Sequence, residues 1–153
     1  PCAVCCNWSE FGNDGFLVYT DCKIMKLVIQ GRLPCMNDLI TANRRNRYAG
    51  AKLKKDTQRQ IEDVLLPQIQ LRSTARYGFS GKVAVTVRFY EPDKRRDEDN
   101  VLSGMKFIFD AMQGIGLIEN DNQAHLHIAH AEVFVDKKNP RIEIELEQFS
   151  ENA

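Results

Sequence analysis

The chain has 153 residues, with 21 Lys and Arg against 21 Asp and Glu, and 43% of its residues are hydrophobic. This length and composition are typical of one compact domain with an apolar core, and they exclude extensive disorder. No run approaches the 18 apolar residues of a membrane-spanning helix. Because the formal net charge is zero, any affinity for nucleic acid must come from local clusters of charge.

The first 24 residues contain most of the cysteines, namely Cys2, Cys5, Cys6 and Cys22. No basic region followed by a long apolar segment is present there, so we expect no export signal and free thiols in a reducing cytosol. The first convincing strand begins at Met25. We therefore interpret residues 1–24 as an N-terminal extension, 25–148 as the folded domain and 149–153 as a tail.

Periodicity predicts the elements of the domain in chain order. A strand over 25–30 is followed by a helix over about 38–66, broken near Gly50 and ended or kinked by Pro67. Alternating valines predict a strand over 82–90, closed by a polar loop.

A second helix is predicted over about 100–113, since Val101, Met105, Ile108 and Met112 form an apolar stripe. Residues 126–135 and 141–148 are predicted to form a hairpin. This order predicts an α+β fold, with a small, mostly antiparallel sheet of about four strands packed with two main helices.

Candidate catalytic residues are concentrated between residues 93 and 123. Asp97 and Asp99 stand two apart where a loop enters the second helix, so in an extended backbone both side chains project to one side. Converging carboxylates repel each other unless a cation lies between them, and a hard cation such as Mg²⁺ prefers oxygen ligands. A third acid, Asp121, follows the helix and can return to the same end of the sheet. The three acids are therefore candidate metal ligands.

Lys106 follows Asp99 by nearly two helical turns, on the same side of the predicted helix. There it could meet a phosphate or a developing negative charge near the metal. The acids and Lys106 also have structural explanations that need no catalytic role. An Asp-x-Asp step can cap a helix, which the spacing alone favours, and Lys106 with Asp110 can form a solvated pair one turn apart.

A second charged region is the segment 41–60, which holds seven cations and one acid. Such a run is more often a solvated helix face, yet Arg47 stands beside Tyr48, and cations next to an aromatic ring suit a DNA backbone. The residues predicted to contact DNA are Arg44, Arg45, Arg47, Lys52, Lys54, Lys55, Arg95, Arg96, Lys137 and Lys138.

Four motifs then follow one another: Arg95-Arg96-Asp97-Glu98-Asp99-Asn100, Lys106, Phe109-Asp110-Ala111-Met112 and Ile118-Glu119-Asn120-Asp121-Asn122-Gln123. Over about residues 25–148 this ordered set resembles the RusA-type Holliday junction resolvases, in the variant found in Gram-positive bacteria and their phages. The step from Asn100 to Lys106 is three residues longer than in the family, so Lys106 is matched through its spacing to Asp110. The family's acidic pair is Asn120-Asp121 here, so its first acid is replaced by an amide.

The resemblance implies a cytoplasmic homodimer that uses Mg²⁺, with Mn²⁺ as a substitute, to nick paired strands of four-way DNA junctions in recombination and repair. It places the catalytic and metal-binding carboxylates on Asp97, Asp99 and Asp121, and the essential lysine on Lys106. A two-fold dimer would present two equivalent sites to a junction of approximate two-fold symmetry.

Two alternatives stay open. The first is a non-catalytic DNA-binding phage protein on the same fold, against which the three intact acids argue. The second is a zinc protein that uses the N-terminal cysteines or the histidines of 125–130. The cysteines lack the spacing of paired zinc knuckles. Strand alternation separates His125 and His127 from His130, so structural zinc is not expected.

Overall fold

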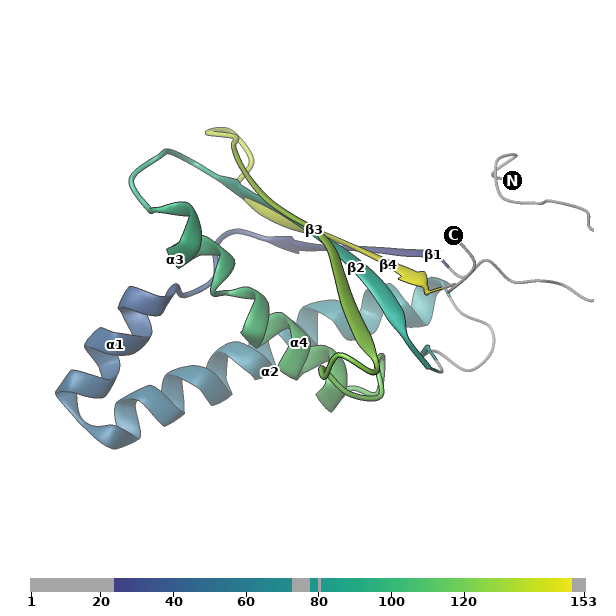
Figure 1. The fold of residues 1–153 in the computed structure, drawn as a ribbon. Helices are drawn as coiled ribbons and strands as arrows, with labels where there is room; N and C mark the ends of the chain where they lie inside the picture. The colour runs from purple at the N-terminus through teal and green to yellow at the C-terminus, as the bar shows by residue number, and fades with distance from the viewer. Residues whose placement is uncertain (1–23, 73–77, 80, 150–153) are drawn as a thin grey trace, which may run out of the picture.

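In the computed structural model the described residues are 24–72, 78, 79 and 81–149, which form a sheet with helices on one face (Figure 1). The predicted extension, apart from Ile24, and the tail after Phe149 lie outside them. The elements are β1 (Ile24–Gln30), α1 (Met36–Arg45), α2 (Arg47–Arg72), β2 (Val83–Glu91), α3 (Glu98–Leu102), α4 (Met105–Gly114), β3 (Leu126–Val135) and β4 (Arg141–Gln148). No helix in the described part of the chain is long and apolar enough to cross a membrane.

The strands lie in the order β1-β4-β2-β3. β2 and β3 are parallel, whereas β4 pairs antiparallel with both β1 and β2. The predicted α+β fold with a small, mostly antiparallel sheet of about four strands is therefore confirmed. The predicted hairpin of β3 with β4 is wrong, because β2 lies between these two strands.

The burial of the two strands explains their places in the sheet. β4 buries every second residue, so it can contribute one full face to the core from a central position. Most of β3 is exposed, which suits an edge strand. The segment between them crosses the end of β2. There the Asp136 N–H donates to the Glu91 carbonyl at 2.8 Å, and the Gly31 N–H donates to the Pro140 carbonyl at 2.9 Å.

The core lies between the sheet and the helices α2 and α4. β2 turns its alternate residues toward it, and the apolar stripe predicted for the second helix is buried there in large part, as are Ile61 and Leu65 of α2. The core includes Leu27, Ile61, Leu65, Val83, Val85, Val87, Phe89, Ile108, Met112, Ile142, Ile144 and Leu146. The other face of the sheet is polar and carries ion pairs between neighbouring strands, such as Lys26 with Glu145 at 3.6 Å.

The first predicted helix is two helices, and the break lies at Asn46 rather than Gly50. Asn46 is extended and ends α1, while its side-chain oxygen accepts a hydrogen bond from the Ala49 N–H at 2.8 Å in the first turn of α2. Gly50 instead permits close packing of the two helices, since a Cβ there would lie 1.7 Å from the Asn43 Oδ1. The helix also continues through Pro67 to Arg72 and does not end at residue 66.

The second predicted helix is also interrupted, at Ser103 and Gly104, between α3 and α4. The Ser103 hydroxyl donates to the Asn100 carbonyl at 2.5 Å and accepts from the Met36 N–H at 2.9 Å. This side chain therefore ties the break to the first residue of α1.

Candidate active site

Lys106 and Asp121 form the most strongly coupled charged pair of the predicted site. Lys106 lies in the first turn of α4, and its Nζ donates to the Asp121 Oδ2 and lies 3.0 Å from the Asp110 Oδ1. The loop after α4 thus returns Asp121 to the side of this helix. The pKa of Lys106 is raised, chiefly by its hydrogen bond to Asp121 and then by that to Asp110. The same hydrogen bond lowers the pKa of Asp121, so both groups are charged at neutral pH.

The other two predicted acids lie at the start of α3, and both are exposed. Asp97 occupies the N-cap position, but its side chain makes no capping hydrogen bond. Its carbonyl, and not its carboxylate, accepts the Val101 N–H. Capping, which the spacing favoured, therefore does not use this side chain. No described residue forms an ion pair with the carboxylate of Asp97 or Asp99.

The predicted convergence of all three acids on one point is not seen in the described residues. No three His, Cys, Asp or Glu side chains there come together in an arrangement that could hold a metal ion. The donor chemistry nevertheless suits a hard divalent cation, because the acids offer only oxygen and two carboxylates have no ion-pair partner among the described residues. The Lys106 ammonium already supplies a positive charge at Asp121. The assignment of Asp97, Asp99 and Asp121 as ligands stays a prediction.

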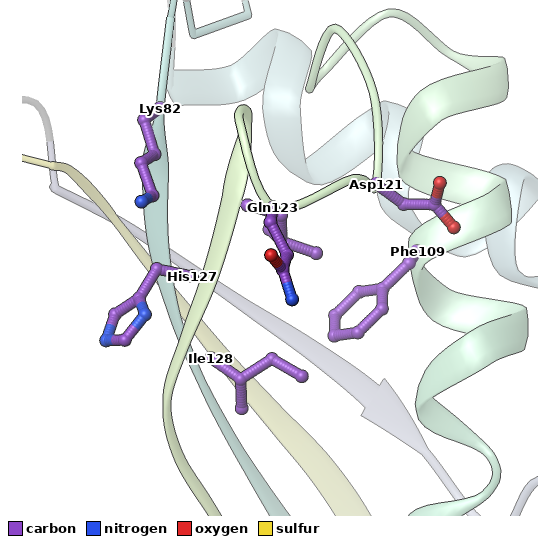
Figure 2. Close-up of a pocket in the computed structure, with 7 residues that line it drawn as sticks. Lys82, Phe109, Asp121, Gln123, His127 and Ile128 are labelled. Carbon is purple, nitrogen blue, oxygen red and sulfur yellow. The ribbon is translucent and has the colours of Figure 1, made fainter.

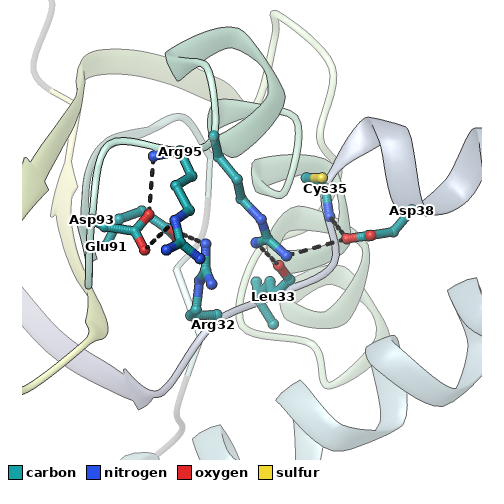
Figure 3. Close-up of polar contacts among 8 residues, drawn as sticks. Arg32, Leu33, Cys35, Asp38, Glu91, Asp93 and Arg95 are labelled. Carbon is teal, nitrogen blue, oxygen red and sulfur yellow. Dashed lines mark hydrogen bonds and ion pairs between the residues drawn. The ribbon is translucent and has the colours of Figure 1, made fainter.

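The loop that carries Asp97 is fastened to the start of α1 by Arg96, which donates to Leu33 and Asp38. Both acceptors are labelled in Figure 3. The guanidinium of Arg96 donates to the Leu33 carbonyl at 3.0 Å and to the Asp38 carboxylate at 3.4 Å. The same carboxylate accepts the Cys35 N–H at 2.8 Å, and this bond is the main cause of the lowered pKa of Asp38. Arg96, predicted to contact DNA, therefore has a structural anchoring role directly before Asp97.

Arg95 has a different partner and lies beside Asp93 (Figure 3). Its side chain is 90% exposed, against 26% for Arg96, and its one ion pair among the described residues is a loose contact of 3.6 Å with Asp93. Behind it, Arg32 forms an ion pair with Glu91, which is buried at the end of β2. Of the two adjacent arginines, Arg95 is the one that a DNA strand could reach.

The predicted DNA-contacting residues of α1 and α2 lie on one exposed stretch, which we call the basic arm. It comprises Arg44, Arg45, Arg47, Lys52, Lys54 and Lys55, which are exposed or nearly so. No ion pair joins any of the six to an acid of the described residues. Tyr48 is 69% exposed, and the Arg47 guanidinium lies 4.9 Å from the centre of its ring. Lys137 and Lys138, in the turn before β4, are also exposed.

A pocket of about 470 Å³ adjoins Asp121, between α4 and the start of β3 (Figure 2). Gln123 projects into it between Phe109 of α4 and the β3 side chains. The pocket is lined by Lys82, Phe109, Asp121, Gln123, Leu126, His127 and Ile128. Sequence reasoning assigned no role to Lys82 or Gln123, and it considered His127 only as a candidate zinc ligand. Gln123 was inside the family motif, but nothing local places Lys82 and His127 beside this pocket, because only the pairing of β2 with β3 brings them there.

The histidines differ from their predicted arrangement. A shift of register between Val85 and Thr86 makes Ala129 an extra residue in β3, a β-bulge. His127 and His130 therefore pair with Ala84 and Thr86 and share one face, which simple alternation had excluded. His125 lies 3.2 Å from Glu119 and 2.8 Å from Asn122. The N-terminal cysteines of the zinc alternative all lie outside the described residues.

A family model described as Endodeoxyribonuclease RusA matches residues 40–147, a region that contains the Lys106–Asp121 site and all the elements of the fold except β1, the start of α1 and the last residue of β4. No curated protein matches the chain. The matched region covers most of the chain and includes Asp97, Asp99, Lys106 and Asp121. The protein belongs to the RusA endodeoxyribonuclease family, whose members are nucleases that hydrolyse DNA.

Proposed function

We propose that this protein is a Mg²⁺-dependent endonuclease that resolves four-way DNA junctions by paired, symmetric nicks in recombination and repair. It would act as a homodimer in the cytoplasm of a bacterial or phage-infected cell, and Mn²⁺ would substitute for Mg²⁺. Family membership supports the nuclease class. The observation that carries the proposal for this site is the Lys106–Asp121 pair, which brings two motif residues from separate segments together.

The acids would act as the metal-binding part of the site. Asp97 and Asp99 have carboxylates free of ion pairs in the described residues, and Asp121 supplies a third from the loop after α4. A bound Mg²⁺ would polarise the scissile phosphate and activate water. Two basic residues orient these acids: Arg96 holds the Asp97 loop, while Lys106 holds Asp121.

The Lys106 ammonium would stabilise the negative charge of the reacting phosphate. Its raised pKa keeps the ammonium protonated, and its side chain is 59% exposed, so a phosphate oxygen can approach it. A charged donor aimed at developing negative charge stabilises a transition state without having to reorganise.

The basic arm and Arg95 would contact the DNA backbone. Their cations are exposed, and those of the arm have no acidic partner in the described residues, so phosphates would not have to displace existing ion pairs. Lys137 and Lys138 would add contacts from the turn between β3 and β4. Such contacts position DNA without reading its sequence.

A nicking assay tests the proposal. A labelled four-way junction and a linear duplex of the same sequence are incubated with the protein, with Mg²⁺, with Mn²⁺ or with chelator. We expect paired nicks in the junction only, with either metal. Binding of the junction without nicks in every metal would instead support the non-catalytic DNA-binding alternative, and equal cleavage of the duplex would contradict junction specificity.

A further inference from the structure

His125 is the last residue of the segment between α4 and β3, residues 115–125, which we call the Asp121 loop. Its main chain is fixed to the sheet, because its carbonyl accepts the Val83 N–H at 2.9 Å at the start of β2. Its own N–H donates to the Asn122 carbonyl at 3.0 Å, which closes a turn between Asp121 and β3. The backbone of His125 therefore has a defined place beside an inner strand of the sheet.

The imidazole of His125 turns back toward the same loop and contacts residues on both sides of Asp121. Its Nδ1 lies 2.8 Å from the Asn122 Oδ1, and its Nε2 lies 3.2 Å from the Glu119 carboxylate. These partners stand one residue after and two residues before Asp121. One ring thus joins the two ends of the four-residue segment that presents the acid.

The acceptors determine where the hydrogens of the ring lie. The Ala124 N–H donates to the Asn122 Oδ1 at 3.1 Å, so the oxygen of this amide also faces the ring, and Nδ1 must donate to it. Nε2 faces a carboxylate, which when ionised can only accept. A neutral imidazole has one N–H and can make only one of these bonds, whereas a ring protonated at both nitrogens makes both. The arrangement therefore suits the positively charged ring, whose charge also pairs with Glu119.

The other contacts of this segment leave it dependent on the ring. Among the residues that the structure describes, the one other bond to the Glu119 carboxylate is a long one of 3.4 Å from the Gly81 N–H. The carboxylate of Asp121 is held from outside the loop by Lys106, which is itself 59% exposed. Without His125, the direction of Asp121 would depend mainly on this exposed lysine.

We propose that His125 is a positioning residue of the candidate active site: by joining Glu119 to Asn122, its imidazole holds the loop so that the Asp121 carboxylate faces the site. This inference deepens the proposed function and rests on it, because that proposal makes Asp121 a metal ligand. Removal of a group that orients a metal ligand typically lowers metal affinity or activity about 10- to 100-fold. No hydrogen bond or ion pair of the described residues joins His125 to Asp121 itself, so His125 would act through the loop.

The test is single-turnover nicking of a bound four-way junction by full-length variants with Mg²⁺. His125→Ala removes both ring bonds, and we expect about a tenfold lower rate at an unchanged dissociation constant for the junction. His125→Gln keeps a donor that can reach Glu119, and His125→Asn keeps one that can reach Asn122, so each should recover part of the rate. The matched control is Gln58→Ala, which removes a side-chain bond of 2.9 Å to Glu62 on α2 and should nick at the wild-type rate.

Hydrogen exchange of the main-chain amides, measured without DNA or metal, tests the same inference independently of activity. His125→Ala should accelerate exchange in residues 119–124 and leave α4 and β2 unchanged. Unchanged exchange of the loop would overturn the inference, and so would a wild-type nicking rate in this variant. Faster exchange throughout the chain, with no recovery in His125→Gln or His125→Asn, would show general destabilisation and would also overturn it. A wild-type chain that never nicks junctions would contradict the proposed function, and the exchange data alone would then decide whether His125 holds the Asp121 loop.

Discussion

Asp97 and Asp121 belong to the same candidate site, but the chain holds them in different ways. Asp97 is positioned through its backbone, because the neighbouring Arg96 fastens the loop to α1 while no described residue forms an ion pair with the carboxylate itself. Asp121 is positioned through its carboxylate, which the Lys106 ammonium contacts directly. Asp97 can therefore receive a cation at once, whereas Asp121 must exchange the Lys106 ammonium for it.

The largest effect on nicking should come from removing the charge of Asp97 or that of Asp121. We expect Asp97→Asn and Asp121→Asn each to lower junction nicking at least about a hundredfold, because asparagine keeps the shape but removes the charge that a metal ligand supplies. Binding to the junction should persist or tighten, since less negative charge faces DNA. Gel-shift and nicking assays on the same samples measure both. Glu98→Gln is the matched control, and full activity in either aspartate variant would refute the assigned role.

Arg96 and Arg95 offer a sharper comparison, since they are adjacent and only one is an anchor. Arg96→Ala removes the bonds to Leu33 and Asp38, so we expect about 1–3 kcal/mol lower stability and a reduced nicking rate of bound junction. Arg95→Ala should weaken binding and leave the unfolding free energy nearly unchanged. Urea unfolding and single-turnover nicking distinguish them. Equal behaviour of the two variants would mean that Arg96 does not position the Asp97 loop.

Changes in the basic arm should alter the affinity for DNA and have little effect on the nicking step. Replacing Arg44, Arg45 and Arg47 by Ala should weaken DNA binding and flatten its salt dependence. The slope of log affinity against log salt should fall by about 0.9 for each phosphate of duplex DNA that the variant no longer neutralises. Lys26→Ala with Arg88→Ala, on the polar face of the sheet, is the control. An unchanged slope in the triple variant would make the arm an ordinary solvated helix surface.

The Lys106–Asp121 pair should make a small, pH-dependent contribution to stability. The lowered pKa of Asp121 means that its contribution is present above the unfolded value of about 3.9 and is lost as pH falls through the lower folded value. The raised pKa of Lys106 means that its contribution is present below about 10.4 and is lost as pH rises through the higher folded value.

Because Lys106 is largely exposed, we expect Asp121→Asn to cost less than about 1 kcal/mol near neutral pH. The difference from the wild-type chain in urea unfolding should shrink as the pH is lowered below about 3.9. A difference that stays constant across the acid range would show that the ion pair is not its cause.

The smallest effect is expected from the N-terminal extension. A chain beginning at Met25 should fold, dimerise and nick junctions at the full-length rate, because all the family motifs follow that residue. If the extension instead covers apolar surface, its removal would cost about 25 cal/mol for each Å² exposed. Aggregation or a monomer in gel filtration would show that the extension belongs to the fold.

Local patterns predicted the type of most elements, since apolar periodicity reports which face of a segment is buried. The stripe through Ile108 and Met112 and the alternating valines of β2 are both buried as predicted. The helix breaks were misplaced or missed, because they depend on contacts between distant segments. Asn46 caps the next helix, and Ser103 bonds to Met36. Neither contact can be read from the spacing of apolar residues.

The sequence nominates the residues of the candidate site, whose roles stay a prediction, but it does not give their arrangement. The order of motifs identified Asp97, Asp99, Lys106 and Asp121, yet nothing local shows that Lys106 contacts Asp121 or that Arg96 turns inward. The bulge at Ala129 likewise moves His127 and His130 to one face. One extra residue reverses the side of every position that follows it, so simple alternation fails beyond it.

The central place of β4 has a consequence for the order of events in folding. The strand made last, Arg141–Gln148, lies between the first strand and the second, so β1 pairs with a segment from the far end of the chain. Contacts of such long separation slow folding, because the loop must close before they form. During synthesis β1 therefore has no partner strand in this sheet until the C-terminal segment leaves the ribosome. A chain ending at Pro140 should fail to fold cooperatively, although it would retain all four predicted catalytic residues.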